Sequence, residues 1–64
     1  DMQAADYVRA AELIRQYADM RLGLVDASVV AIAERLDITT IATLDRRDFA
    51  VVRPAHCDAF ELVP

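Results

Sequence analysis

Apolar side chains recur at helical spacing along residues 4–18. The stripe consists of Tyr7, Ala11, Ile14 and Ala18, widened by Ala10, Leu13 and Tyr17. Polar side chains fall on or near the opposite face: Asp6, Arg9, Glu12, Gln16 and Asp19. The pattern predicts an amphipathic helix whose role is packing. We expect Asp6–Arg9 and Glu12–Arg15 to form ion pairs along it, each worth roughly 0.2–0.5 kcal/mol.

A second helix is predicted over residues 27–36, after a break at Gly23, the one glycine of the chain. This segment is apolar nearly all round, which is typical of a helix covered on most sides. Asp26 stands directly before it, in a position suited to an N-cap. Asp37 ends it, where a glycine would adopt the left-handed cap conformation more easily.

The C-terminal half of the chain alternates short elements. Residues 38–44 are β-branched and bounded by aspartates, which predicts a strand buried on both faces of a parallel sheet. Residues 45–49 are expected to form a loop or a short helical turn, and Arg53-Pro54 stops any short element before it. Residues 60–63 are expected to form a last edge strand. The chain is therefore predicted to be α/β, with Phe49 and Phe60, like Tyr7 and Tyr17, in the core.

Simple geometry brings Asp26 and Asp45 to one edge of this sheet. Helix 27–36 is about 15 Å long, and strand 39–44 returns about 20 Å. Because the connection between them is short, the helix start and the strand end lie at the same edge. Open α/β sheets bind ligands at that edge, the carboxyl end of their parallel strands. Two carboxylates there, with Asp48 as a third candidate, suit Mg²⁺ or Mn²⁺.

Plainer interpretations stand beside the metal site. Asp26 alone is explained as a helix cap, Asp45 as a turn residue and Asp48 as a solvated loop charge. Arg46 and Arg47 are candidate phosphate contacts or simply solvated surface charges. His56 and Cys57 lack the further ligands of a zinc site.

Composition narrows the class of protein. The chain has 64 residues, is 56% hydrophobic and carries a net charge of −4 with no lysine. The apolar excess predicts a missing partner surface, and the acidic charge argues against a protein that simply coats phosphates. One cysteine, no signal peptide and no apolar run of about 20 residues predict a cytoplasmic protein without a membrane span.

Two motifs point to a family. Residues 24–31 (LVDASVVA) and 40–49 (TIATLDRRDF) resemble the C-terminal half of a PIN-domain ribonuclease, most closely the VapC-type toxins of bacterial toxin–antitoxin pairs. The ending, residues 60–64, is similar to the closing strand of those proteins. The resemblance implies a three-layer PIN-like fold with a mainly parallel sheet, of which residues 1–64 form the C-terminal half.

The resemblance also implies a function. PIN domains gather three or four acidic residues around Mg²⁺ or Mn²⁺ and hydrolyse RNA phosphodiesters. Asp26 matches the third acidic position and Asp45 the fourth, which varies in residue type; the first two have no counterpart here. The expected partners are the N-terminal half of the domain, RNA, a second copy and a cognate antitoxin, and the chain alone is expected to be inactive.

Two other functions remain open. The chain is alternatively a non-catalytic interaction or structural module, in which helix 27–36 docks a partner. A phosphoacceptor aspartate, as in receiver domains, is disfavoured because the chain has no lysine.

Overall fold

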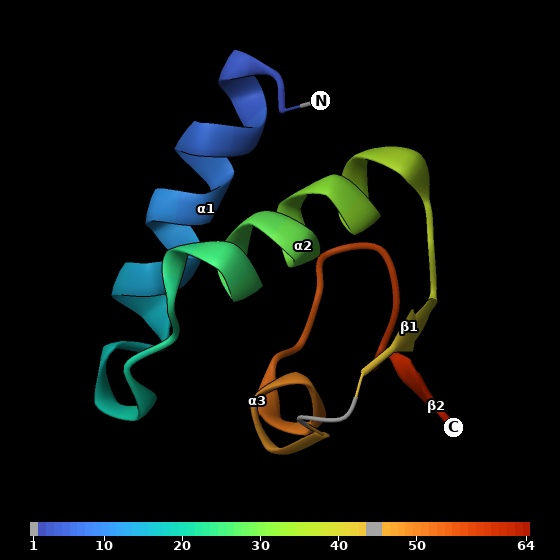
Figure 1. Ribbon diagram of the computed structural model, residues 1–64. Coiled ribbons are helices and arrows are strands. Elements are labelled where there is room, and N and C mark those ends of the chain that lie inside the picture. Colours follow the sequence, from blue (N-terminus) through green and yellow to red (C-terminus); the bar gives the residue numbers. More distant parts are fainter. Residues whose placement is uncertain (1, 44–45) are drawn as a thin grey trace.

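The computed structural model describes residues 2–43 and 46–64. Figure 1 shows two long helices lying against each other, with two short strands and a short helix beneath them. The elements, in chain order, are α1 (Ala4–Gln16), the 3₁₀ turn η1 (Ala18–Met20), α2 (Leu24–Leu36), β1 (Thr40–Ala42), α3 (Arg46–Val51) and β2 (Glu61–Val63). No helix in these residues is long and apolar enough to cross a membrane.

Helix α1 confirms the predicted amphipathic helix. Its first turn is closed by the Gln3 N–H, which donates to Asp6 Oδ2 at 2.9 Å. Ala10 and Leu13 are fully buried against the rest of the chain. Tyr7 was predicted to lie in the core, and that prediction is wrong, because its side chain is 57% exposed.

Helix α2 begins three residues earlier than the apolar pattern indicated. Gly23 is the N-cap, and the Ala27 N–H donates to its carbonyl at 2.9 Å. Asp26 is therefore not an N-cap but the third residue of the helix. The prediction missed the first turn because Asp26 suits an N-cap and so favoured a start at residue 27; Leu24 and Val25, in the missed turn, are 59% and 76% exposed.

The end of α2 confirms Asp37 as a left-handed cap. Asp37 has φ 57° and ψ 41°, and the Ile38 N–H donates to the Ala33 carbonyl at 2.8 Å. The Asp37 N–H reaches the Glu34 carbonyl at 3.3 Å, which completes a Schellman motif. This motif turns the chain from α2 towards β1.

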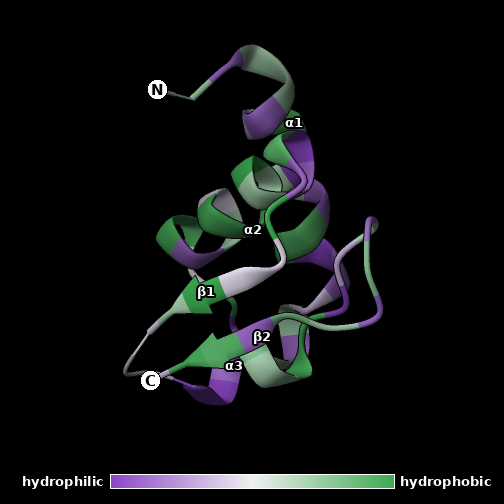
Figure 2. Cartoon of the chain, turned by 90° about the vertical axis from the view of Figure 1, so that its right-hand side faces the viewer, coloured by the Kyte–Doolittle hydropathy of each residue, from purple (hydrophilic) through white to green (hydrophobic). Residues whose placement is uncertain are grey.

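The sheet is parallel, as predicted, but shorter than residues 38–44. Thr40 pairs with Glu61, Ile41 with Leu62 and Ala42 with Val63, and Figure 2 shows the two strands side by side. Ile38 does not join the strand because its N–H caps α2. The prediction of a strand buried on both faces is wrong for β1, since Ile41 is buried while Thr40 and Ala42 are exposed.

One hydrophobic core joins all the elements. The largest fully buried side chains come from α1, α2 and the segment after α3: Leu13, Val30 and Val52. Phe49 and Phe60 are buried, as predicted, and their rings meet edge to face at 6.5 Å. Residues near the start of α2 and in α3 belong to this same core, among them Ala27 and Phe49.

Candidate functional site

Asp26 lies in the first turn of α2 and is half-buried. Side chains four residues apart share a helix face, so Asp26 stands one turn before Val30, which is fully buried in the core. The carboxylate therefore lies at the rim of the core. It is also at the helix end where the backbone dipole favours a negative charge.

Asp48 repeats this arrangement in α3. It lies in the first turn and is half-buried, and Val52, four residues later, is fully buried in the same core cluster as Val30. The Val52 N–H donates to the Asp48 carbonyl at 3.3 Å. Asp26 and Asp48 thus stand at the rim of one core, and Asp48 is part of a helix rather than a loop.

Asp45 lies outside the described residues. The predicted meeting of Asp26 and Asp45 therefore stays a prediction. Thr43, between β1 and that position, donates its N–H to the Val63 carbonyl at 2.9 Å.

The donor chemistry of Asp26 and Asp48 suits a hard divalent cation, because both offer carboxylate oxygens from half-buried positions. Within residues 2–43 and 46–64, no three His, Cys, Asp or Glu side chains come together as a possible metal site. Mg²⁺ commonly takes only one or two protein carboxylates and keeps several waters. These residues therefore match Mg²⁺ or Mn²⁺ in donor type, and a fuller acidic cluster requires Asp45 or acids from outside the described part.

The two neighbouring arginines of α3 differ in their contacts. Arg46 Nη1 donates to the Pro64 carbonyl at 2.6 Å, and Nη2 lies 3.5 Å from the Leu62 carbonyl. Its guanidinium therefore holds the C-terminal strand. Arg47 is exposed, and its side chain forms no hydrogen bond or ion pair with the rest of the described chain.

His56 holds two segments of the chain together. Its Nε2 lies 2.6 Å from the Ile38 carbonyl, so this nitrogen is the donor, and its ring packs edge to face on Phe60 at 5.8 Å. Cys57 Sγ lies 3.8 Å from the same nitrogen. The pair lines an open pocket formed by residues 53–58, and its polar contacts join that segment to the turn before β1.

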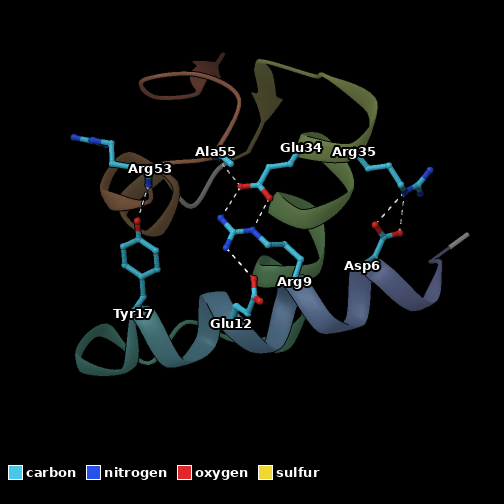
Figure 3. A network of polar contacts seen from close by, with 8 residues as sticks. All are labelled: Asp6, Arg9, Glu12, Tyr17, Glu34, Arg35, Arg53 and Ala55. Atoms are coloured by element: carbon cyan, nitrogen blue, oxygen red, sulfur yellow. Dashed lines mark hydrogen bonds and ion pairs between the residues drawn. The ribbon is translucent and has the colours of Figure 1, made fainter.

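A polar network between α1 and α2 was missed by the sequence analysis (Figure 3). Glu34 accepts two hydrogen bonds from Arg9, at 2.7 and 3.0 Å, and one from the Ala55 N–H at 2.8 Å. Burial raises the pKa of Glu34, but these donors outweigh it and leave the pKa below its usual value. Glu34 therefore ties three segments together as a carboxylate.

A second ion pair joins the same helices. Arg35 Nε contacts both carboxylate oxygens of the buried Asp6, at 3.0 and 3.1 Å. The hydrogen bond from Arg35, with that from the Gln3 N–H, lowers the pKa of Asp6. The predicted Asp6–Arg9 pair is therefore wrong, and Glu12 pairs with Arg9 rather than Arg15. Spacing along one helix cannot reveal partners 25 or 29 residues apart.

Comparison with known proteins decides the family. Residues 1–53 match the PIN domain family. The chain is a member of that family. This PIN chain is also 41% identical, over 61 residues, to Ribonuclease VapC26 of Mycobacterium tuberculosis (strain ATCC 25618 / H37Rv). The match covers 95% of this chain and 45% of that protein, so the chain spans less than half the length of its curated relative.

These similarities confirm two expectations. The resemblance to VapC-type PIN proteins, indicated by residues 24–31 and 40–49, is confirmed by the matched family and relative. The α/β class with a parallel sheet is confirmed by the fold.

Proposed function

We propose that this PIN chain supplies Asp26, Asp45 and Asp48 to the Mg²⁺- or Mn²⁺-dependent site of an RNA-cleaving, VapC-type toxin. The observation that carries the proposal is the position of Asp26, half-buried in the first turn of α2 within a PIN domain. The name of the relative, Ribonuclease VapC26, supports RNA as the substrate.

The residues of this chain have distinct roles in the proposed reaction. Asp26 and Asp48 hold the cation with their carboxylates, and Asp45 is the third ligand. When bound, the cation lowers the pKa of a water and stabilises charge at the phosphate. The buried stripe behind Asp26 keeps its carboxylate at a fixed place on the rim, so little reorganisation is required when RNA arrives.

The remaining acids are proposed to come from an N-terminal half of the same domain. The edge of the sheet at β1, on the side away from β2, supports this proposal. Glu61 N–H donates to the Thr39 carbonyl at 2.8 Å and Thr43 N–H to the Val63 carbonyl at 2.9 Å. By alternation, the backbone groups of Thr40 and Ala42 point away from β2. Parallel sheets are normally covered on both faces, so a further strand and layer belong beside β1.

The proposed partners follow from the family resemblance. We propose a cytoplasmic homodimer that is neutralised by a cognate antitoxin. The exposed apolar side chains at both ends of α2, Leu24, Val25 and Leu36, are consistent with surfaces that other chains cover.

The proposal is tested with the domain assembled from this chain and its N-terminal half. Single-stranded RNA is expected to be cleaved in Mg²⁺ or Mn²⁺ and to stay intact in EDTA. Mn²⁺ titration by calorimetry is expected to show binding that Asp26→Asn weakens and that Asp19→Asn, an exposed acid of η1, leaves unchanged. Intact RNA under all conditions, with no Mn²⁺ binding, would instead support a non-catalytic interaction module.

A further inference from the structure

The arginines of this chain divide into those already engaged and those that are free. Within residues 2–43 and 46–64, four arginines contact protein groups: Arg9, Arg35, Arg46 and Arg53. Arg53 donates to the carbonyls at the end of α3. The same residues offer no hydrogen bond or ion pair to the side chains of Arg15, Arg21 and Arg47.

Of these three arginines, Arg47 is the one directly adjacent along the chain to a described candidate ligand. Arg15 belongs to the last turn of α1, and Arg21 follows η1. Arg47 lies in the first turn of α3, directly before Asp48. Its neighbour Arg46 is turned by about 100° around the helix and is held by Pro64 and Leu62 carbonyls.

The acidic charge of the chain favours an arginine of this kind beside bound RNA. The net charge is −4, and RNA brings a further negative charge at each phosphate. Carboxylates at the site repel the strand, and a local guanidinium, like the bound divalent cation, offsets this repulsion where the RNA backbone passes them. A guanidinium offers several donors in a planar fork that matches phosphate oxygens.

We propose that Arg47, and not its neighbour Arg46, contacts an RNA phosphate next to the Asp26–Asp48 rim. Arg47 is a binding residue: it holds the strand by one charge-assisted contact and takes no part in bond breaking. Arg46 keeps β2 in place. This inference rests on the proposed ribonuclease function, and its test separates the two.

The test measures equilibrium binding of a fluorescein-labelled single-stranded RNA in Ca²⁺, with the assembled domain, over a salt series. Arg47→Gln is expected to weaken binding about three- to tenfold and to reduce the slope of log affinity against log salt by about 0.7, the value for one phosphate of a single strand. Arg15→Gln removes one exposed charge elsewhere and is the matched control. It is expected to leave the slope unchanged.

Arg46→Gln gives the second comparison. It is expected to lower the thermal stability of the domain and to keep the salt slope of the original protein. Arg47→Gln with an unchanged slope, or with the slope of Arg15→Gln, overturns the proposal. A larger slope change for Arg46→Gln than for Arg47→Gln also overturns it.

Cleavage distinguishes this failure from failure of the proposed function. If RNA is cut in Mn²⁺ but Arg47→Gln behaves like Arg15→Gln, the Arg47 contact is wrong and the ribonuclease stands. If RNA binds with an Arg47-dependent slope but is never cut, the contact stands and the ribonuclease is wrong. Absence of RNA binding contradicts both.

Discussion

Glu34 shows what a single residue contributes to this domain. Its side chain is 10% exposed, and that of Arg9, its partner, is 29% exposed. Through Arg9 and the Ala55 N–H, Glu34 connects α1, α2 and the segment that leads to β2. An ionised acid in such a place is stabilising only while all its donors are present.

Glu34→Gln is therefore expected to destabilise the domain by about 1–3 kcal/mol, because Arg9 loses its main charge partner. Urea unfolding at neutral pH measures this. Glu12→Gln is the control, since Glu12 contacts the same Arg9 but is 52% exposed, and its effect is expected to stay within about 0.5 kcal/mol. Equal losses for the two variants would mean that burial of Glu34 does not matter.

Asp6 is expected to make the stability of the domain depend on pH. Its pKa is lowered from 3.8 in the folded state, first by Arg35 and then by the Gln3 N–H. A pKa that is lower in the folded state than in the unfolded state stabilises the fold at pH values above the unfolded-state pKa. This stabilisation is lost as the pH falls through the folded-state pKa. The stability difference between the original chain and Asp6→Asn is expected to be constant from pH 7 to about 5, and to shrink below about pH 4. Urea unfolding across this range measures it; a difference that is the same at pH 3 and pH 7 contradicts the pairing.

Elements were easier to predict from the sequence than their ends. The apolar stripe located α1 and the interior of α2, because burial against a core imposes helical spacing. The first turn of α2 was missed, because Asp26 suits an N-cap and so favoured a start at residue 27. Residues 38 and 39 were predicted to join the strand because their side chains are β-branched. The Ile38 N–H instead donates to the Ala33 carbonyl in the cap of α2.

The cap of α2 supports a test at this scale. Asp37 has φ 57°, a conformation that glycine adopts without cost. Asp37→Gly is expected to stabilise the domain by roughly 0.5–1 kcal/mol, seen as a higher urea midpoint. Asp37→Ala keeps the Cβ and is expected to give no gain. A loss of stability in the glycine variant would show that the Asp37 side chain contributes more than its backbone strain costs.

The candidate site was predictable only in part. Asp26 stood out because an acid precedes an apolar helix, and its place at the start of α2 was correct to within one turn. Asp48 was singled out as a third candidate ligand, and of the two structures predicted for residues 45–49, a loop or a short helical turn, the helical one is observed for residues 46–49. The contacts of Arg46 with Pro64 and Leu62 are long-range and leave no local pattern.

At the scale of the whole molecule, residues 2–43 and 46–64 form a two-stranded parallel sheet, three α-helices and a 3₁₀ turn around one core. A sheet of this kind is rarely stable with an open edge and an uncovered face. This open edge and face support the proposal that further elements of a PIN domain pack beside the described part.

Hydrogen exchange tests the proposed second half of the domain. In the assembled domain, the N–H groups of Thr40 and Ala42 are expected to exchange slowly, because a further strand accepts them. Ile41 N–H points to β2 and serves as the internal reference. Exchange at Thr40 and Ala42 as fast as at the exposed Asp58 would mean that no strand lies beside β1.

The role of Asp26 is tested most directly by the rate of RNA cleavage by the assembled domain in Mn²⁺, compared between the original chain and Asp26→Asn. The substitution keeps the size of the side chain and removes its charge. The cleavage rate is predicted to fall by at least about 100-fold, which is more than expected for a residue that only contacts a metal ligand. Asp19→Asn is expected to keep the original rate. Cleavage by Asp26→Asn at the original rate would contradict the account.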